Sequence, residues 1–437
     1  MRGSHSHTVA YVAEAQIPPS PPPVIERGAI RWLHENLFSS WLNAILTVVS
    51  VAFIVWGLWS LVPWLILDAV WDAESLRNCR TLGDGGCWAV VNERLNQWIY
   101  GFYPSDLYWR PNLTFVLFFV ALAPVLFDEV PFRRQLFIHT ALYPLIAYWL
   151  LWGGSFWVIL AVLAGPIVGY LAGFMLGTRI YGVDRFLAAV AVTIVVTVLW
   201  WMTAIDPVDQ ALTSGVGSVA LESVGSARFG GFLLTMVIGV VGISASLPIG
   251  ILLALGRKSD LPFIKTLSVI FIEFIRGVPL ITLLFVANVV LNYFLPPGTV
   301  FDKLLRVLIM VTMFSSAYIA EVVRGGLAAL PEGQYEAANA MGLDYWKSMR
   351  LIVLPQALKI SIPGIVNTFI GLFKDTTLVS VIALFDPLGI IAPIRAHQSW
   401  NGLIWEPYLF VAAFFFVCCF GMSRYSMYLE RKLERER

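Results

Sequence analysis

The stretch that decides the fold is Glu336-Ala337-Ala338-Asn339-Ala340-Met341-Gly342, which is followed after nine residues by Ile352-Val353-Leu354-Pro355. It is polar and lies between strongly apolar runs. On a short helix, Ala338 and Gly342 would form one smooth face that another protein's backbone can approach closely. Glu336 and Asp344 flank this face as hydrogen-bond acceptors. The neighbouring apolar anchors are Leu343, Tyr345, Trp346 and Met349. The stretch predicts a docking surface rather than a catalytic site.

The spacing of these residues resembles the EAA-x3-G-x9-I-x-L-P loop in the membrane subunits of bacterial ABC importers, and every fixed position of that pattern is matched. Further segments are similar to the polar amino-acid uptake branch, most closely to its general L-amino-acid permease subunits with a long N-terminal extension. These segments are Gly256–Ser259, Glu273–Leu280 and Lys374–Ser380. The resemblance covers residues 229–437 and implies a five-helix type I ABC importer core with a coupling loop at 331–355.

The resemblance also implies partners for this chain in the bacterial inner membrane. These are a second permease subunit in a heterodimer, two ATP-binding subunits and a periplasmic amino-acid-binding protein. The implied ATPase-coupling residues are Glu336, Ala337, Ala338, Gly342, Leu343, Asp344 and Trp346. No Gly-x4-Gly-Lys-Ser/Thr phosphate loop occurs in the sequence, so we expect the partner ATPase to use the ATP and this chain to bind no cofactor. Broad L-amino-acid uptake is implied, and no pocket residue specifies which amino acids pass.

Composition places the chain in a membrane. Of its 437 residues, 58% are hydrophobic and 13% are charged, about half the charged share of a soluble protein. The net charge of +1 gives no reason to expect a nucleic-acid partner. Apolar runs of about twenty residues, the length that crosses a bilayer, occur at 42–69, 112–129, 136–152, 155–177, 186–205, 231–255, 267–295, 304–323, 358–384 and 404–423. They predict an all-α polytopic protein of about ten transmembrane helices.

The distribution of Lys and Arg predicts the orientation and the domains. These residues are more frequent in the segments that face the cytoplasm if both termini lie inside. The exception is the loop 71–110, which holds four arginines on the periplasmic side. We expect a cytoplasmic Pro-rich tail at 1–40, an extension of about five helices at 41–228, and the permease core at 229–437. The small and polar residues 206–230 would separate the last two.

Two cysteines in the periplasmic loop are candidates for a disulfide. Cys79 and Cys87 lie eight residues apart, with three glycines between them that permit a tight turn. Disulfides persist in an oxidising compartment such as the periplasm. The sequence leaves two possibilities open, a Cys79–Cys87 bond and two free cysteines in a flexible loop.

A glycine stripe marks one apolar run in the extension. Gly165, Gly169, Gly173 and Gly177 recur every four residues and fall on one line of a helix. Small residues allow membrane helices to approach closely, because packing drives their association. The pattern favours a contact within the extension over a contact with a second subunit.

Two polar clusters in the core are candidates for the translocation path. Glu273 and Arg276 share a helix face, where they either line the path or form ion pairs near the cytoplasmic interface. Gly277-Val278-Pro279 should break that helix. The second cluster comprises Asn367, Lys374, Asp375, Thr376 and Thr377. The expected ion pairs are Arg276 with Asp375, Glu273 with Lys374, and the local pair Glu321 with Arg324.

A second class of function explains the helices and the buried charges equally well. An ion-gradient-driven secondary amino-acid transporter would need no ATPase, but it leaves the stretch around Glu336 unexplained. Enzyme motifs such as His-Glu-x-x-His and Gly-x-Ser-x-Gly do not occur, and no histidines are spaced to bind a metal. Dependence of uptake on ATP rather than on the proton gradient separates the two transporter classes.

Overall fold

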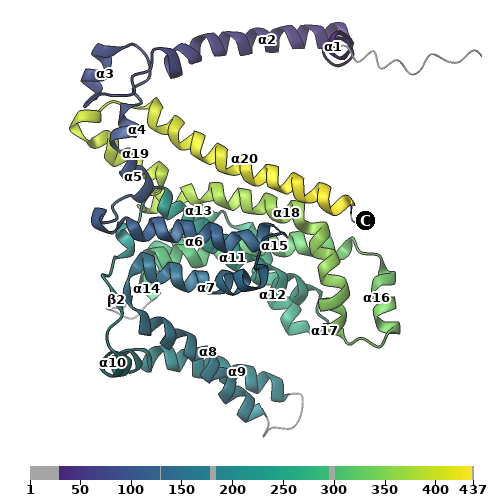
Figure 1. Ribbon diagram of the computed structural model, residues 1–437. Helices are drawn as coiled ribbons and strands as arrows, with labels where there is room; N and C mark the ends of the chain where they lie inside the picture. Colours follow the sequence, from purple (N-terminus) through teal and green to yellow (C-terminus); the bar gives the residue numbers. More distant parts are fainter. Residues whose placement is uncertain (1–28, 128, 178–183, 295–300, 436–437) are drawn as a thin grey trace, which may run out of the picture. The chain divides into compact units, whose positions relative to one another are not determined.

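A computed structural model describes residues 29–127, 129–177, 184–294 and 301–435 (Figure 1). The expected tail up to residue 28, with Arg27, lies outside the described residues, as does Arg179. The chain divides into two compact units. The first comprises Met1–Trp71 and Cys79–Cys87, and the second comprises Asp72–Asn78 and Trp88–Arg437.

The first unit is built around one long apolar helix. Its helices are α1 (Ala29–Leu37), α2 (Trp41–Val62) and the π-helical η1 (Pro63–Leu67). The Ser40 hydroxyl caps α2 by accepting a hydrogen bond from the backbone N–H of Asn43 at 3.2 Å. No residue of α2 is buried. Cys79 and Cys87 are joined in a disulfide, with their Cα atoms 5.9 Å apart. The helix α3 (Leu76–Leu82) begins at the junction of the two units.

The second unit contains the remaining elements. Those before residue 229 are α4 (Ala89–Glu93), α5 (Leu95–Tyr100), η2 (Ser105–Leu107), α6 (Trp109–Leu126), α7 (Arg133–Trp152), β1 (Gly154–Ser155), α8 (Phe156–Gly177), α9 (Asp184–Thr203), α10 (Ile205–Val216), β2 (Ala220–Leu221) and η3 (Ser226–Arg228). Those after it are α11 (Gly231–Lys258), α12 (Pro262–Gly277), α13 (Leu280–Phe285), η4 (Val286–Val290), α14 (Leu291–Phe294), α15 (Lys303–Ala328), α16 (Glu332–Ala340), α17 (Tyr345–Ser348), η5 (Met349–Val353), α18 (Leu354–Asp375), η6 (Thr376–Ile382), α19 (Pro387–Ala396), η7 (Gln398–Trp400) and α20 (Trp405–Arg435). The described residues are thus almost entirely helical, apart from a short antiparallel pairing of β1 with β2.

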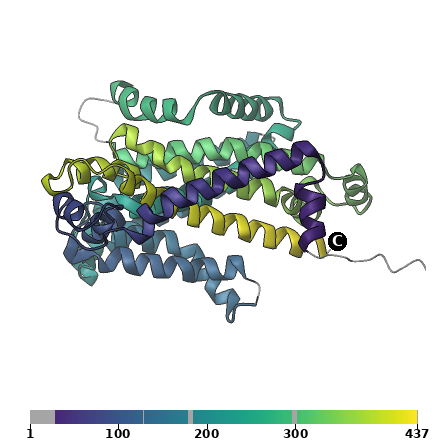
Figure 2. The ribbon, with the colours of Figure 1, turned by 90° about the horizontal axis from the view of Figure 1, so that it is seen from above.

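The core of the second unit lies where α11, α15 and α18 pack together, and Figure 2 shows its long helices running roughly alongside one another. Small residues permit this close packing. A Cβ atom on Gly250 of α11 would lie only 2.9 Å from the backbone oxygen of Ser316 on α15. Leu234 and Leu304 are fully buried in the same core. The helices therefore approach at the positions where side chains are smallest.

Residues before position 229 contribute to this same core. Trp98 on α5 is fully buried, and its ring lies 5.2 Å from that of Phe410 on α20. Trp152 and Phe229 are also in ring contact, at 4.5 Å. The segment expected to separate two domains includes the helix α10, and Phe229 forms a backbone bridge with Gly101. Residues from Trp88 onward belong to one compact unit with the permease core.

Among the described residues, seven helices are long and apolar enough to cross a membrane, or up to nine if each of two bent pairs is one span. The prediction of an all-α polytopic membrane protein is confirmed. The expected span at 136–152 is helical as α7 but is not among these seven, because polar and aromatic residues such as Gln135 and His139 lower its mean hydropathy. The predicted break at Gly277-Val278-Pro279 is also confirmed, since α12 ends at Gly277 and the chain bends by 102° before α13.

The glycine stripe of α8 packs within the chain, as its spacing favoured. A Cβ atom on Gly169 would lie 2.6 Å from the backbone oxygen of Thr193 on α9, and one on Gly173 would lie 2.6 Å from that of Ala189. Gly165 faces Trp200 and Trp201 of α9, whose indole N–H groups donate to backbone carbonyls of α8 at 2.8 and 2.9 Å. The surroundings of Gly177 lie outside the described residues. The stripe therefore joins α8 to α9.

Candidate functional site

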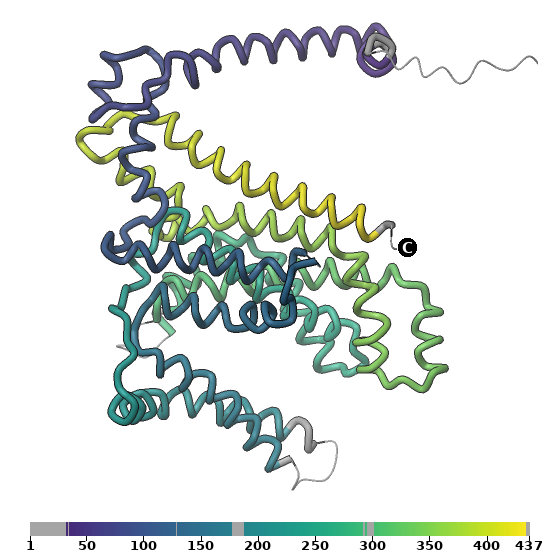
Figure 3. The backbone as a smooth tube through the Cα atoms, viewed as in Figure 1, coloured from purple at the N-terminus to yellow at the C-terminus, as the bar shows by residue number. Residues whose placement is uncertain are grey.

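The predicted coupling segment, residues 331–355, projects from one end of the helices of the second unit (Figure 3). Its first helix, α16, begins after Pro331, whose fixed φ suits a helix start. The helix ends at Ala340, and Gly342 adopts the left-handed conformation with φ +70°. The carboxylate of Asp344 then caps α17 by accepting a hydrogen bond from the backbone N–H of Lys347 at 2.8 Å. Pro331 precedes the short helix α16 and Gly342 follows it, while Asp344 caps the next helix, α17.

The exposed face of α16 differs from the predicted one. Ala338 is fully buried, whereas Glu336 and Ala337 are exposed. Ala338 and Gly342 do not share a helix face, because Gly342 lies beyond the last helical residue and turns the chain, with the Leu343 N–H donating to the carbonyl of Ala338 at 3.2 Å. The prediction of a shared Ala338–Gly342 face was wrong in this respect. The surface that a partner can reach is centred on Glu336 and Ala337.

The turn after α16 adds apolar and acidic groups to this surface. The side chain of Trp346 is 69% exposed, and Met341 is 75% exposed. Leu343 is partly buried between them. The pKa of the Asp344 carboxyl is lowered, chiefly because the backbone N–H of Lys347 donates to it, with a further contribution from the Lys347 side chain. At neutral pH, Asp344 therefore presents a negative charge beside Trp346.

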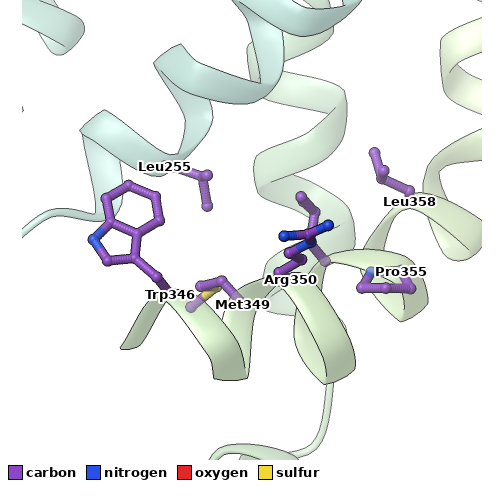
Figure 4. A pocket seen from close by; sticks show the side chains of 7 residues that line it. Leu255, Trp346, Met349, Arg350, Pro355 and Leu358 are labelled. Carbon is purple, nitrogen blue, oxygen red and sulfur yellow. The ribbon is translucent and has the colours of Figure 1, made fainter. Parts of the chain in front are cut away.

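An open apolar pocket of about 330 Å³ continues the coupling segment onto the helices (Figure 4). It is lined by Leu255, Trp346, Met349, Arg350, Leu354, Pro355 and Leu358. Figure 4 shows the Arg350 side chain between these apolar groups. Arg350 is exposed. The pocket therefore offers an apolar surface with one cation at its edge.

Two polar contacts hold α16 against the helices of the second unit. The ammonium group of Lys258, in the last turn of α11, donates to the hydroxyl of Tyr335 at 2.7 Å and lies 4.2 Å from the centroid of the Tyr335 ring. The amide of Gln356 on α18 donates to the side-chain oxygen of Gln334 at 3.0 Å. Both contacts leave the face with Glu336 free of intramolecular packing, so α16 is positioned without being covered.

The charged residues predicted for the translocation path fall into two separate groups. Glu273 and Arg276 belong to an ion cluster, the Arg–Glu cluster, which we define as Arg257, Glu273, Arg276, Glu321 and Arg324. One Arg257 nitrogen lies 2.8 Å from Glu273 and 2.6 Å from Glu321, and an Arg276 nitrogen lies 3.8 Å from Glu321. The local pair of Glu321 with Arg324 is confirmed, at 2.9 Å. The expected pairs Arg276–Asp375 and Glu273–Lys374 are wrong, because Arg257 and Glu321 on neighbouring helices occupy these positions instead.

The second group lies at the other end of α18. Asn367 and Lys374 are exposed, and Asp375 is partly exposed. Within the described residues, neither Lys374 nor Asp375 forms an ion pair with the Arg–Glu cluster. The hydroxyls of Thr376 and Thr377 donate to the carbonyls of Phe373 and Lys374 in the same chain turn. The two threonines thus have backbone partners, whereas the charged groups beside them do not meet an opposite charge on another helix of the described part.

Two cations in the last turn of α11 make contacts that the sequence did not predict. The sequence assigns Arg257 and Lys258 to a family motif and to the cations that set the orientation, whereas in the structure they contact Glu273, Glu321 and Tyr335. Glu321 was expected to pair with Arg324 alone, and it contacts three arginines. No group of three or more His, Cys, Asp or Glu side chains suited to a metal occurs within the described ranges.

Comparison with known proteins agrees with this geometry. The family described as binding-protein-dependent transport system inner membrane component matches residues 246–435. The chain is 55% identical over 436 residues to the glutamate/glutamine/aspartate/asparagine transport system permease protein BztC of Rhodobacter capsulatus. The alignment covers 98% of this chain and 99% of that protein. It is 40% identical over 425 residues to the inner membrane amino-acid ABC transporter permease protein YhdY of Escherichia coli. That alignment covers 96% of this chain and 97% of the relative.

Among solved structures, an amino acid ABC transporter crystallised with histidines is 30% identical, covers 46% of this chain and 91% of that chain, and has a TM-score of 0.42. The two relatives above align along almost the whole chain, including the residues before position 229. The resemblance stated from the motifs is therefore confirmed. The chain belongs to the binding-protein-dependent transport system inner membrane component family and, within it, to the amino-acid ABC transporter permeases.

Proposed function

We propose that this chain carries L-amino acids from the periplasm across the inner membrane, driven by a separate ATPase subunit that docks on the coupling segment. The observation that carries the proposal is the state of α16. It is held in place by Tyr335 and Gln334, yet Glu336 and Ala337 remain exposed. An exposed short helix attached firmly to a membrane bundle is suited to pass a rigid-body movement from a partner to the bundle.

The complete importer would contain more than this chain. We expect a second permease subunit in a heterodimer, two ATP-binding subunits that hydrolyse the ATP, and a periplasmic amino-acid-binding protein. The exposed apolar surfaces of the described helices, such as Phe263 at 79% and Phe274 at 62%, fit burial against lipid or another subunit. This chain would bind no nucleotide itself.

The orientation with both termini in the cytoplasm agrees with two features. The Cys79–Cys87 disulfide lies in the loop assigned to the periplasm, where such bonds persist. Arg257 and Lys258 lie at the same end of the core as α16, where the excess of cations marks the cytoplasmic side. In this orientation, the tail at 1–40 would lie in the cytoplasm. The helices of the extension at 41–228 and of the core at 229–437 would cross the membrane between the cytoplasm and the periplasm.

We place the substrate path along one face of α18. Asn367, Gly371 and Lys374 follow one another at intervals of four and three residues, so they share this face. A Cβ atom on Gly371 would meet no other atom within 4 Å, and Lys374 is exposed. A charged group at membrane depth faces a cavity or another subunit. Lys374 would bind a carboxylate of the substrate, while Asp375 would bind its ammonium group.

Uptake kinetics test this path. We expect Lys374→Gln to raise the KM for L-glutamate roughly tenfold, because a hydrogen bond to a charged group contributes about 1.5–3 kcal/mol. L-Glutamate is the first substrate named for the 55% identical relative. Lys265→Gln, which removes an exposed cation of α12, is the matched control. Unchanged KM and maximal rate in Lys374→Gln, with uptake intact in the wild type, would exclude Lys374 from the path.

Co-purification tests the docking surface. This chain is expressed with the subunits encoded beside it, as wild type and as Ala337→Asp, which adds bulk and charge to the exposed face of α16. We expect the variant to insert in the membrane and to lose the ATP-binding subunit. Ala396→Asp, which changes an exposed alanine at the end of α19, should retain it.

The outcome also separates the two classes of transporter. A wild-type chain that binds no ATP-binding subunit, and whose uptake stops with a protonophore but not on ATP depletion, would support the alternative of an ion-gradient-driven amino-acid transporter. Retention of the ATP-binding subunit by Ala337→Asp would move the docking surface away from α16.

A further inference from the structure

The Arg–Glu cluster adds charged contacts between three helices that an apolar cluster, with Leu255, Ile272 and Val323, also joins at this level. Arg257 ends α11, Glu273 and Arg276 lie on α12, and Glu321 and Arg324 lie on α15. Three guanidinium groups face two carboxylates, so the cluster has a net charge of +1. Both carboxylates are already in contact with guanidinium groups of this chain, so the cluster is built as an internal ion network rather than as a binding site for an amino acid.

Glu321 is the centre of this cluster. Its side chain is 16% exposed, less than that of any other member, and it contacts Arg257, Arg276 and Arg324. Ion pairs between partly buried groups are stronger than those in open water, because the effective dielectric constant is lower. Removing this one carboxylate would leave three cations close together. Glu321 thus provides charged contacts between α11, α12 and α15 in addition to the apolar packing of these helices.

The neighbouring residue connects this cluster to the coupling segment. Lys258 follows Arg257 in the last turn of α11, and its ammonium group contacts both the hydroxyl and the ring of Tyr335 on α16. Two consecutive cations thus reach two different elements: Arg257 contacts α12 and α15, and Lys258 contacts the short helix outside the membrane. A displacement of α16 would pull on the same helix end that carries Arg257.

The far side of the cluster is the broken helix. Glu273 and Arg276 lie in the last two turns of α12, directly before the 102° bend that leads to α13. Arg276 also lies 5.5 Å from the ring centroid of Tyr318 on α15. The last turn of α12 is thus held by ion pairs on one side of the bend. At such a bend, a rigid helix can change its direction relative to its neighbours.

We propose that Lys258, Arg257 and Glu321 form a transmission link from the coupling helix α16 to the broken helix α12, with Glu321 as a positioning residue. The proposal rests on the proposed function, because it assigns a route to the movement that a docked ATPase would produce. It requires that the contacts act in series: Tyr335 with Lys258, then Arg257 with Glu321 and Glu273. A break at either point should uncouple ATP hydrolysis from uptake while the subunits stay assembled.

The test uses the whole transporter in proteoliposomes with the binding protein, and it measures L-glutamate taken up per ATP hydrolysed. We expect Glu321→Gln to co-purify with the ATP-binding subunit as the wild type does, and to lower uptake per ATP at least fivefold, within the usual range of coupling effects. Lys258→Met should do the same. The double variant should lose no more uptake per ATP than the single variant with the larger loss, because both substitutions break one route.

Glu93→Gln is the matched control, since it removes a carboxylate from an ion pair with Arg94 outside the cluster and should leave the ratio unchanged. Should Glu321→Gln fail to assemble, Glu273→Gln tests the same link at a side chain that is 54% exposed. An unchanged ratio in an assembled cluster variant, or a double-variant loss equal to the product of the single losses, would overturn the link. A wild type without ATP-driven uptake would instead overturn the proposed function.

Discussion

The glycine stripe of α8 and the coupling segment are both rich in small residues, and they have opposite surroundings. Gly165, Gly169 and Gly173 of the stripe face α9, at distances that leave no room for a methyl group. In the coupling segment, a Cβ atom on Gly333 or Gly342 would meet nothing within 4 Å. Small residues therefore occur in two settings: those of the apolar span pack against a helix of the same chain, and those of the polar segment have open space around them, as the proposed docking of an ATPase requires.

The largest effect should come from filling the closed site. We expect Gly169→Leu to destabilise the protein by on the order of 3 kcal/mol, because the new side chain would overlap the backbone of α9 at Thr193. Thermal unfolding in detergent micelles measures this loss. Gly421→Leu on α20 is the control, since that glycine has open space around it. Equal stability of the two variants would remove the contrast between closed and open glycines.

The contrast between closed and open sites also applies to polar groups, and the buried carboxylate of Asp386 is a closed polar site. Asp386 is fully buried at the start of α19 and accepts hydrogen bonds from the backbone N–H groups of Leu388 and Gly389 at 3.1 and 2.9 Å. Burial raises the pKa of this carboxyl to about 6, despite those hydrogen bonds. The folded protein thus binds this proton more tightly than the unfolded chain does. The resulting stabilisation is complete below about pH 4 and is lost as the pH rises through about 6.

Asp386→Asn should retain the cap and abolish this pH dependence. We expect the stability of the wild type relative to the variant to fall by on the order of 2 kcal/mol between pH 4 and pH 7. Unfolding temperatures of both proteins over this pH range provide the measurement. A constant difference between them would mean that Asp386 titrates as it does in water, and that the site is more open than its burial indicates.

The smallest effect should come from the open site. Gly342→Ala should cost about 1 kcal/mol locally, because a residue with a Cβ atom is strained at φ +70°. Gly333→Ala, at a helical position of α16, should stabilise the helix by a similar amount. Hydrogen exchange of the α16 amides measures both. Faster exchange in Gly333→Ala than in Gly342→Ala would contradict this assignment of the turn.

Much of the fold could be predicted because a bilayer imposes length and composition on each helix. The apolar runs, the break before Pro279 and the α8–α9 contact followed from these constraints. The compact joining of the extension to the core could not be predicted, since it depends on aromatic contacts such as Trp98 with Phe410, between residues far apart in the sequence. Polarity placed α10 in a linker, although its residues form a helix.

The candidate site shows the same division. The position of the coupling segment followed from a motif of fixed spacing, but its exposed face did not, because the left-handed turn at Gly342 ends the helix before the expected face is complete. Of the predicted ion pairs, only that of Glu321 with Arg324 joins charges that are close in the sequence, and it is the one that forms. Arg257 contacts Glu321 across 64 positions, and sequence spacing carries no information about such a contact.

The contacts of α20 have a consequence for how the protein is made. Its Phe410 packs on Trp98, and the hydroxyl of its Tyr425 donates to the carbonyl of Leu126 at 2.8 Å. The helix α20 thus packs on segments that leave the ribosome long before it. Until α20 is made, Trp98 lacks its aromatic neighbour Phe410, and we expect a chain without α20 to be cleaved more readily by proteases. The synthesis of α20 is therefore the step at which these early segments acquire their final packing.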